Sequence, residues 1–265
     1  MLIDAHAHLD RYDDTLDEAI EQINSNRIFT ISNSMDIPSY ERNLKIAQKC
    51  RLILPTFGVH PWNAPQYTHR LNDLKAYLER SAMYGEIGLD YFFVGDVSAY
   101  PAQREVFEFF LRAAAKHNKI VNIHTKGAEA DVLHMLQQYK VRHVIVHWYS
   151  GPFDVLRSML SFGVYFSIGV ELLRSRHIQA IVRELPMGQI LTETDNPGGY
   201  DSLEGVAGMP HLILDVVGKL AELKETTVEQ IMLSVQSNFV QLIRNAPSLR
   251  DSFLRVCDEL SNDTP

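Results

Sequence analysis

The sequence predicts an α/β protein of the (β/α)8 (TIM) barrel class, regular or distorted, with extra helices at its C-terminal end. Short apolar and β-branched runs recur eight times along the 265 residues, and their starts lie 20 to 37 residues apart. Such spacing leaves room for one helix and two loops between neighbouring strands. The segments between the runs carry apolar residues at helical spacing. A distorted barrel of seven strands is the alternative within the same class.

Each apolar run is expected to form one strand of a parallel barrel. The expected strands are residues 2–9, 28–34, 52–60, 83–90, 120–126, 143–148, 163–170 and 189–194.

Helical spacing is clearest in three of the intervening segments, where one apolar stripe would cover the sheet. The stripes are Leu16, Ile20 and Ile23; Leu71, Leu74 and Leu78; and Val106, Phe109, Phe110 and Ala113. After the last run, residues 212–223, 228–244 and 249–260 are also expected to be helical, and at most one of these helices is needed to close a barrel. No linker interrupts the chain, so we expect one domain over residues 1–261 and a frayed tail over 262–265.

Composition excludes several classes of protein. With 25 Lys+Arg and 33 Asp+Glu the net charge is −8, which disfavours a basic protein that coats nucleic acid but allows a local phosphate site. No apolar run has the length of a membrane span, and the two cysteines lie far apart without a C-x-x-C spacing. We therefore expect a soluble, cytoplasmic protein without membrane contact and without a disulfide framework.

Residues that commonly bind metals follow the expected strands at their C-terminal ends, where barrels of this class place their chemistry. His6 and His8 are two residues apart, so a strand would point both to one face. Glu86 lies inside an apolar strand, where an unpaired charge is costly to bury. One such residue is more often structural, but six at the same end of five strands predict a polynuclear metal site. The six are His6, His8, Glu86, His124, His147 and Asp195.

Imidazole and carboxylate ligands without thiolate suit one or two divalent ions: Zn²⁺, Mn²⁺, Co²⁺ or Mg²⁺. The four histidines favour a transition metal. Such ions activate a bound water and polarise a phosphoryl or carbonyl oxygen. Glu86 and Asp195 are therefore the expected catalytic residues, with Asp195 accepting the proton of the water.

The loops after the strands alternate cations and aromatic rings around the expected site. This pattern suits a few phosphates and unpaired bases, as at the end of a single DNA strand, better than a long duplex. Phe92 and Phe93 either stack on bases or cap the barrel. The residues expected to bind substrate are His60, Trp62, Lys126, Arg174 and Arg176.

The order of these motifs resembles the TatD family of metal-dependent hydrolases over residues 3–243. The motifs are His6-Ala7-His8-Leu9-Asp10, Gly58-Val59-His60-Pro61, Gly85-Glu86-Ile87-Gly88-Leu89-Asp90, Gln103-Arg104, Ile123-His124-Thr125, Val146-His147 and Thr194-Asp195-Asn196-Pro197. The resemblance implies a distorted barrel and nuclease activity on DNA. It also implies that His6, His8 and Asp195 bind one metal, that His124 and His147 bind a second, and that Glu86 bridges both.

Two departures of this sequence from the usual family pattern affect the expected substrate contacts. Lys126 stands where the family usually has arginine, which keeps the charge but loses the bidentate fork. The loop after Pro197 is shorter than in many members. Residues 148–151 and 165–169 resemble a divergent subgroup whose members occur beside phage-defence genes, which implies protein partners in a defence complex.

Three functions are compatible with these residues. The favoured one is a metal-dependent deoxyribonuclease that cleaves phosphodiester bonds at DNA ends with a metal-activated water. The second keeps the metals but hydrolyses an ester or amide, as a D-aminoacyl-tRNA deacylase does. The third is a non-catalytic partner subunit, which would not need all six ligand-type residues.

Overall fold

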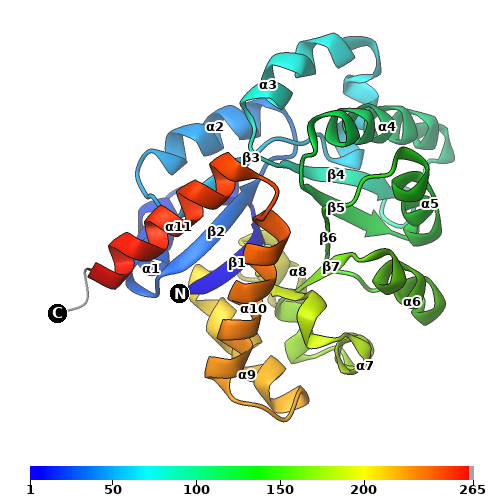
Figure 1. Cartoon of the computed structure of the whole chain (residues 1–265). Coiled ribbons are helices and arrows are strands. Elements are labelled where there is room, and N and C mark those ends of the chain that lie inside the picture. The colour runs from blue at the N-terminus through cyan, green and yellow to red at the C-terminus, as the bar shows by residue number, and fades with distance from the viewer. Residues whose placement is uncertain (263–265) are drawn as a thin grey trace.

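Eight parallel strands surround one axis in the computed structural model, which describes residues 1–262. This (β/α)8 arrangement confirms the predicted fold class, and all eight predicted runs contain a strand (Figure 1). The strands are β1 (Leu2–Ala7), β2 (Ile28–Asn33), β3 (Ile53–Thr56), β4 (Tyr84–Asp90), β5 (Val121–Lys126), β6 (Val144–His147), β7 (Tyr165–Ile168) and β8 (Ile190–Thr192).

The barrel is distorted because its strands form two hydrogen-bonded sheets. One sheet has the order β1-β2-β3 and the other β4-β5-β6-β7-β8. No continuous ladder joins β3 to β4 within residues 1–262: the two sheets are linked there by the isolated bridge from Phe57 to Tyr84 and by hydrogen bonds between Ser34 and the start of β4. The second break between the sheets lies between β8 and β1. There the Thr194 N–H and hydroxyl donate to the two oxygens of Asp4 at 3.0 and 2.7 Å. A buried side chain thus joins β1 to the segment that follows β8.

Helices follow the strands and cover the outside of the barrel. They are α1 (Leu16–Ser25), α2 (Ile37–Ala47), α3 (Lys75–Arg80), α4 (Tyr100–His117), α5 (Glu129–Tyr139), α6 (Phe153–Phe162), α7 (Arg176–Glu184), α8 (Gly198–Glu204), α9 (Ile213–Leu223), α10 (Val228–Ile243) and α11 (Pro247–Asn262). The predicted stripes face inward: Ile23, Leu74 and Phe110 are fully buried.

Local sequence explains where several helices begin. Asp36 and Ser39 form a capping box at the start of α2, and Thr227 and Gln230 form one at the start of α10. Each box satisfies backbone N–H groups that have no partner inside the helix. The segment after β3 forms short 3₁₀ helices before α3 instead of one long α-helix, and Pro61 and Pro65 lie within it. Proline lacks the N–H that a longer α-helix would use.

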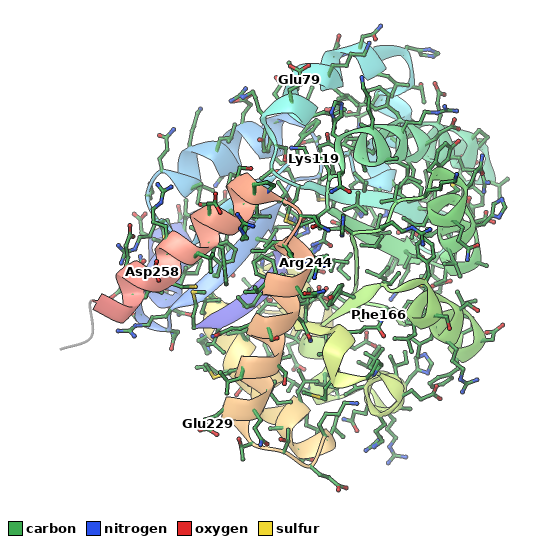
Figure 2. The ribbon with its side chains drawn as sticks, in the orientation of Figure 1. Glu79, Lys119, Phe166, Glu229, Arg244 and Asp258 are labelled. Atoms are coloured by element: carbon green, nitrogen blue, oxygen red, sulfur yellow. The ribbon has the colours of Figure 1, made fainter. Side chains whose placement is uncertain are left out.

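Helices α10 and α11 cover the end of the barrel at which the strands begin (Figure 1). The Asn238 amide donates to the carbonyls of Met187 and Ile190, at the start of β8, at 2.7 and 2.8 Å. The Phe253 ring lies 4.9 Å from Phe29 and 5.0 Å from Phe239. Polar residues such as Glu229 and Asp258 occupy the outer faces of these helices (Figure 2). The C-terminal helices therefore close the barrel on the side opposite the strand ends.

The structure also places some boundaries differently. The run expected to reach residue 194 ends as a strand at Thr192, and Asp195 has a φ of 54°. Helix α11 continues to Asn262, and the rest of the expected tail, residues 263–265, lies outside the described residues. Among residues 1–262 no helix combines the length and the apolar character that crossing a membrane requires.

Candidate metal centre

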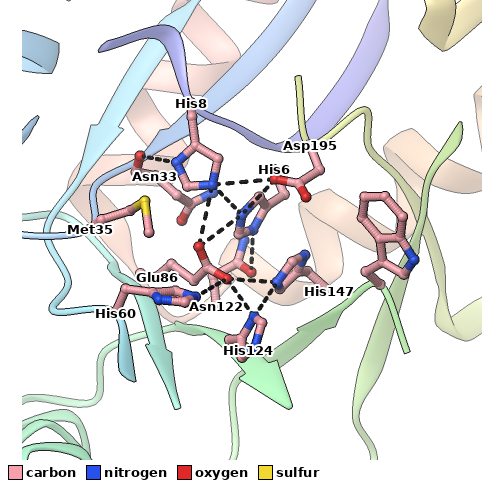
Figure 3. Close-up of polar contacts among 12 residues, drawn as sticks. His6, His8, Asn33, Met35, His60, Glu86, Asn122, His124, His147 and Asp195 are labelled. Atoms are coloured by element: carbon pink, nitrogen blue, oxygen red, sulfur yellow. Dashed lines mark hydrogen bonds and ion pairs between the residues drawn. The ribbon is translucent and has the colours of Figure 1, made fainter. Parts of the chain in front are cut away.

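The six ligand-type residues converge at the C-terminal end of the barrel (Figure 3). They come from β1 and its end, from β4, β5 and β6, and from the loop after β8. Three groups of ligand atoms each lie within 4.8 Å of one another. The groups are His6, Glu86 and His147; His6, His8 and Asp195; and His60, Glu86 and His124.

Glu86 is at the centre of the cluster, and its two oxygens face different histidines. Oε2 lies 3.5 Å from His6 Nε2 and 3.3 Å from His8 Nε2. Oε1 lies 2.9 Å from His124 Nδ1 and 2.7 Å from His147 Nε2. One buried carboxylate therefore contacts both halves of the cluster.

Asp195 completes the half that contains His6 and His8. Its Oδ1 lies 3.6 Å from His6 Nε2 and 3.3 Å from His8 Nε2. The other carboxylate oxygen is turned away from these two rings (Figure 3). The side chain is 19% exposed, whereas those of His6 and Glu86 are 0% and 3% exposed. Asp195 is therefore the carboxylate of the cluster that solvent reaches most easily.

The outer ring nitrogens of three histidines have fixed hydrogen-bond acceptors. His6 Nδ1 lies 3.0 Å from Asn122 Oδ1, and His8 Nδ1 lies 3.0 Å from the Asn33 carbonyl. His124 Nε2 lies 3.0 Å from Asp90 Oδ2. In the neutral imidazole each of these nitrogens donates its hydrogen outward, so the other nitrogen presents a lone pair to the cluster. Metal-binding histidines are typically held in this way.

His147 is held less firmly. Its Nδ1 is 3.8 Å from Glu193 Oε1 and has no hydrogen-bond partner among residues 1–262. Glu193 accepts hydrogen bonds from the Trp148 N–H and the Ser167 hydroxyl. The ring of His147 stacks on His6 with a centroid distance of 3.8 Å, which fixes its plane.

His60 differs from the other four histidines. Its Nδ1 accepts a hydrogen bond from the Trp62 N–H at 3.3 Å, so in the neutral ring Nε2 carries the hydrogen. That nitrogen lies 3.4 Å from Glu86 Oε1. Burial lowers the pKa of His60 to about 4 and keeps the ring neutral. His60 therefore faces the cluster with an N–H donor rather than with a lone pair.

The charges of the cluster fit a divalent cation. Burial disfavours charge on Glu86, yet the surrounding imidazoles hold the pKa of its carboxyl well below the ordinary value. One buried and one partly buried carboxylate and four imidazole lone pairs, without a thiolate, are the donor set of Zn²⁺, Mn²⁺, Co²⁺ or Mg²⁺ sites. A cation would also compensate the carboxylate charges that are otherwise costly to bury.

The cluster lies in the wall of a cavity of about 1050 Å³. His60, Trp62 and Lys126, which were expected to bind substrate, line this cavity. Arg174 and Arg176 are not among its lining residues. Arg174 pairs with Glu204, and Arg176 begins α7 as an exposed residue. Strand counting assigned both arginines to the segment after β7, but it carries no information on side-chain direction.

Three further residues contribute to the site. Arg11 lines the cavity, and Asp90 and Glu193 contact the outer nitrogens of His124 and His147. Asp90 ends a strand and Glu193 is two residues before Asp195, so position at a strand end was a usable signal for both. Arg11 directly follows the motif of residues 6–10, beyond the end of the strand, and nothing in the sequence indicated that it lines the site.

Comparisons with known proteins agree with this geometry. The family described as TatD related DNase matches residues 3–244. The chain is 30% identical over 256 residues to the "Uncharacterized metal-dependent hydrolase YabD" of Bacillus subtilis, covering 92% of this chain and 99% of that protein. It is 27% identical over 266 residues to the human "Deoxyribonuclease TATDN3", covering 94% and 96%.

Solved structures show the same fold. The structure of YJJV, a TATD homolog from Escherichia coli, superposes with a TM-score of 0.83 at 22% identity, covering 91% of this chain and 97% of the other. A TatD family hydrolase from Entamoeba histolytica superposes with a TM-score of 0.80 at 17% identity, covering 91% and 97%. With a family match over nearly the whole chain and a buried histidine and carboxylate cluster at the strand ends, this protein belongs to the TatD family of metal-dependent hydrolases.

Proposed function

We propose that the protein is a deoxyribonuclease that hydrolyses phosphodiester bonds near the ends of single DNA strands. The observation that carries this proposal is the position of Glu86, whose two oxygens divide between the two halves of a cluster beside a large cavity. A relative of this chain is named a deoxyribonuclease.

His6, His8 and Asp195 would hold one divalent ion, His124 and His147 a second, and Glu86 would contact both. When bound, the ions supply a nucleophile at neutral pH and stabilise charge on the phosphoryl oxygens. The outward hydrogen bonds of His6, His8 and His124 keep the ring lone pairs directed at the cluster.

Two side chains act directly on the reacting groups in this proposal. The Asp195 oxygen that is turned away from His6 and His8 accepts the proton of the attacking water (Figure 3). The Nε2–H of His60 faces Glu86 in the wall of the same cavity and donates to a phosphoryl oxygen as its negative charge grows.

Lys126 and Arg11 orient the substrate through its phosphates. Both line the cavity, and Lys126 Nζ is held 2.7 Å from Ser150 Oγ. Two cations suit a short stretch of backbone, because an extended duplex needs many phosphate contacts to bind a protein of net charge −8. Strand ends therefore fit the cavity better than duplex interiors. The expected cytoplasmic location and the expected partners in a defence complex stay predictions.

A substrate panel tests the proposal. Chelated protein is reloaded separately with Mn²⁺, Zn²⁺, Co²⁺ or Mg²⁺ and given end-labelled single-stranded DNA, the matching duplex, RNA and an aminoacyl ester. We expect single-stranded DNA to be shortened from an end, with no cleavage before metal is added. The Glu86→Ala variant controls for contaminating nucleases.

Hydrolysis of the aminoacyl ester with intact DNA would contradict the proposal and support the ester or amide hydrolase instead. The non-catalytic partner subunit is set aside, since the chain belongs to a family of metal-dependent hydrolases.

A further inference from the structure

Three aromatic rings stand at the rim of the cavity with much of their surface exposed. Trp62 follows β3, and Phe92 and Phe93 follow β4; the three are 47%, 68% and 60% exposed, and all line the cavity. Exposures this high favour a ligand contact over the alternative in which Phe92 and Phe93 only cap the barrel, because a capping ring buries most of its surface. Large apolar side chains that remain exposed beside a cavity are a common mark of a ligand contact.

The rings continue a line of edge contacts that begins at the metal cluster. His124 and His60 have centroids 4.6 Å apart, and His60 and Trp62 are also 4.6 Å apart. Trp62 and Phe93 are 6.1 Å apart at 81°, and Phe93 and Phe92 are 5.0 Å apart at 87°. The outer rings are therefore neighbours of the cluster and do not form a separate patch.

The Asp90 carboxylate positions the Trp62 ring and the backbone that carries Phe92 and Phe93. Its Oδ2 accepts from Trp62 Nε1 at 2.8 Å, and its Oδ1 accepts from the N–H groups of Phe92 and Phe93 at 3.0 and 2.7 Å. The Tyr91 N–H donates to the Lys126 carbonyl at 2.8 Å and ties the same loop to β5. The backbone that carries the two phenylalanines is therefore fixed, even though their side chains are exposed.

We infer that Trp62, Phe92 and Phe93 form a nucleobase platform, which binds an unpaired base next to the phosphate held at the metal cluster. Two rings at nearly a right angle make a corner in which a flat ring stacks on one face and meets the edge of the other. Every base has such a face, so stacking tolerates any sequence but requires the base to be unpaired. Lys126, which adjoins the platform through Tyr91, supplies charge for the neighbouring phosphate.

The inference rests on the proposed deoxyribonuclease function and adds a requirement for a base beside the cleaved bond. A duplex cannot meet this requirement without fraying, because its bases are stacked on one another. Preference for a strand end would then arise from base stacking and not only from the size of the cavity.

The test uses two single-stranded oligonucleotides that differ only at the nucleotide beside the cleaved bond. One carries the fluorescent base 2-aminopurine there, and the other carries an abasic residue. Metal-loaded protein is mixed with each oligonucleotide by stopped flow, so that binding and fluorescence are read before cleavage. The variants are Phe93→Leu and Phe92→Leu, which keep apolar volume but lose the ring, and Phe93→Tyr, which keeps the ring. Val97→Ala is the matched control, since Val97 follows in the same loop, is 68% exposed and does not line the cavity.

In the wild type we expect 2-aminopurine to be quenched on binding and the abasic oligonucleotide to bind roughly five- to 100-fold more weakly. Phe93→Leu should lose the quenching and bind the base-bearing oligonucleotide as weakly as the abasic one. Phe93→Tyr and Val97→Ala should resemble the wild type.

Equal binding of the two oligonucleotides by a wild type that cleaves both would overturn the platform and leave the nuclease proposal standing. An equal weakening of both oligonucleotides in Phe93→Leu would also overturn it. Failure of the wild type to bind or cleave either oligonucleotide would overturn both proposals.

Discussion

The carboxylate of Asp90 accepts a hydrogen bond from the outer ring nitrogen of His124 at 3.0 Å. The same carboxylate binds the Trp62 indole and the backbone of the loop that carries Phe92 and Phe93. One buried side chain thus orients a proposed metal ligand and positions the rim of the cavity. Metal binding and the shape of the substrate site are therefore linked through Asp90.

Asp90→Asn should lower metal affinity by about 10- to 100-fold, because the amide keeps the shape but loses the charge that orients His124. Competition with a chromogenic chelator measures this affinity. Asp96→Asn is the control, since Asp96 lies in the same loop and caps only Ser98. Equal affinities in wild type and Asp90→Asn would show that Asp90 does not support the metal site.

Glu86→Gln should lower the bound metal below the one or two equivalents expected for the wild type and lower turnover by at least about 100-fold. The amide fills the same volume, but it cannot balance the charge of two cations. Elemental analysis after metal is added back measures the stoichiometry. Glu129→Gln is the control, since Glu129 is another buried cavity glutamate and accepts a hydrogen bond from the Gly127 N–H. Normal turnover of Glu86→Gln at saturating metal would contradict the bridging assignment.

His60→Gln should leave the metal stoichiometry unchanged while turnover falls by about 100-fold, because His60 faces the cluster with an N–H donor. Glutamine fills part of the space of the ring, but it does not hold an N–H toward Glu86 as the hydrogen bond from the Trp62 N–H does for the imidazole. His124→Gln, in contrast, should lose metal. Metal analysis of both variants separates the two roles, and loss of metal from His60→Gln would identify His60 as a ligand.

Arg11→Ala and Lys126→Ala should each flatten the plot of log affinity against log salt by about 0.7 for single-stranded DNA, the value for one phosphate contact. Binding across a salt series measures the slope. Arg174→Ala and Arg176→Ala are matched controls that should keep the wild-type slope, since neither residue lines the cavity. A flatter slope in these two variants would restore the prediction made from the sequence.

Phe253→Ala should lower the free energy of unfolding by about 3–5 kcal/mol, because the ring is buried between Phe29 and Phe239. Leu254→Ala, at the next position of α11, should change it by less than about 1 kcal/mol, because Leu254 is 42% exposed. Urea denaturation compares the two variants. Equal losses would show that α11 does not stabilise the barrel through Phe253.

The fold class and the approximate positions of the eight strands were determined by the sequence alone. Apolar runs and helical stripes depend on local periodicity, which every eight-stranded barrel must satisfy to bury its sheet. The same local information identified the six ligand-type residues, because parallel strands bring their C-terminal ends together whatever their exact register.

Only the tertiary structure decided how side chains from different strands meet. The division of the Glu86 oxygens, the donor role of His60 and the central position of Asp90 depend on contacts between residues far apart in the chain. The same holds for Arg174, which pairs with Glu204, and for Arg11, which lines the cavity. Periodicity states which face of a strand a residue occupies, but a loop residue has no such period. The direction of a loop side chain is set by the residues that the folded barrel places next to it.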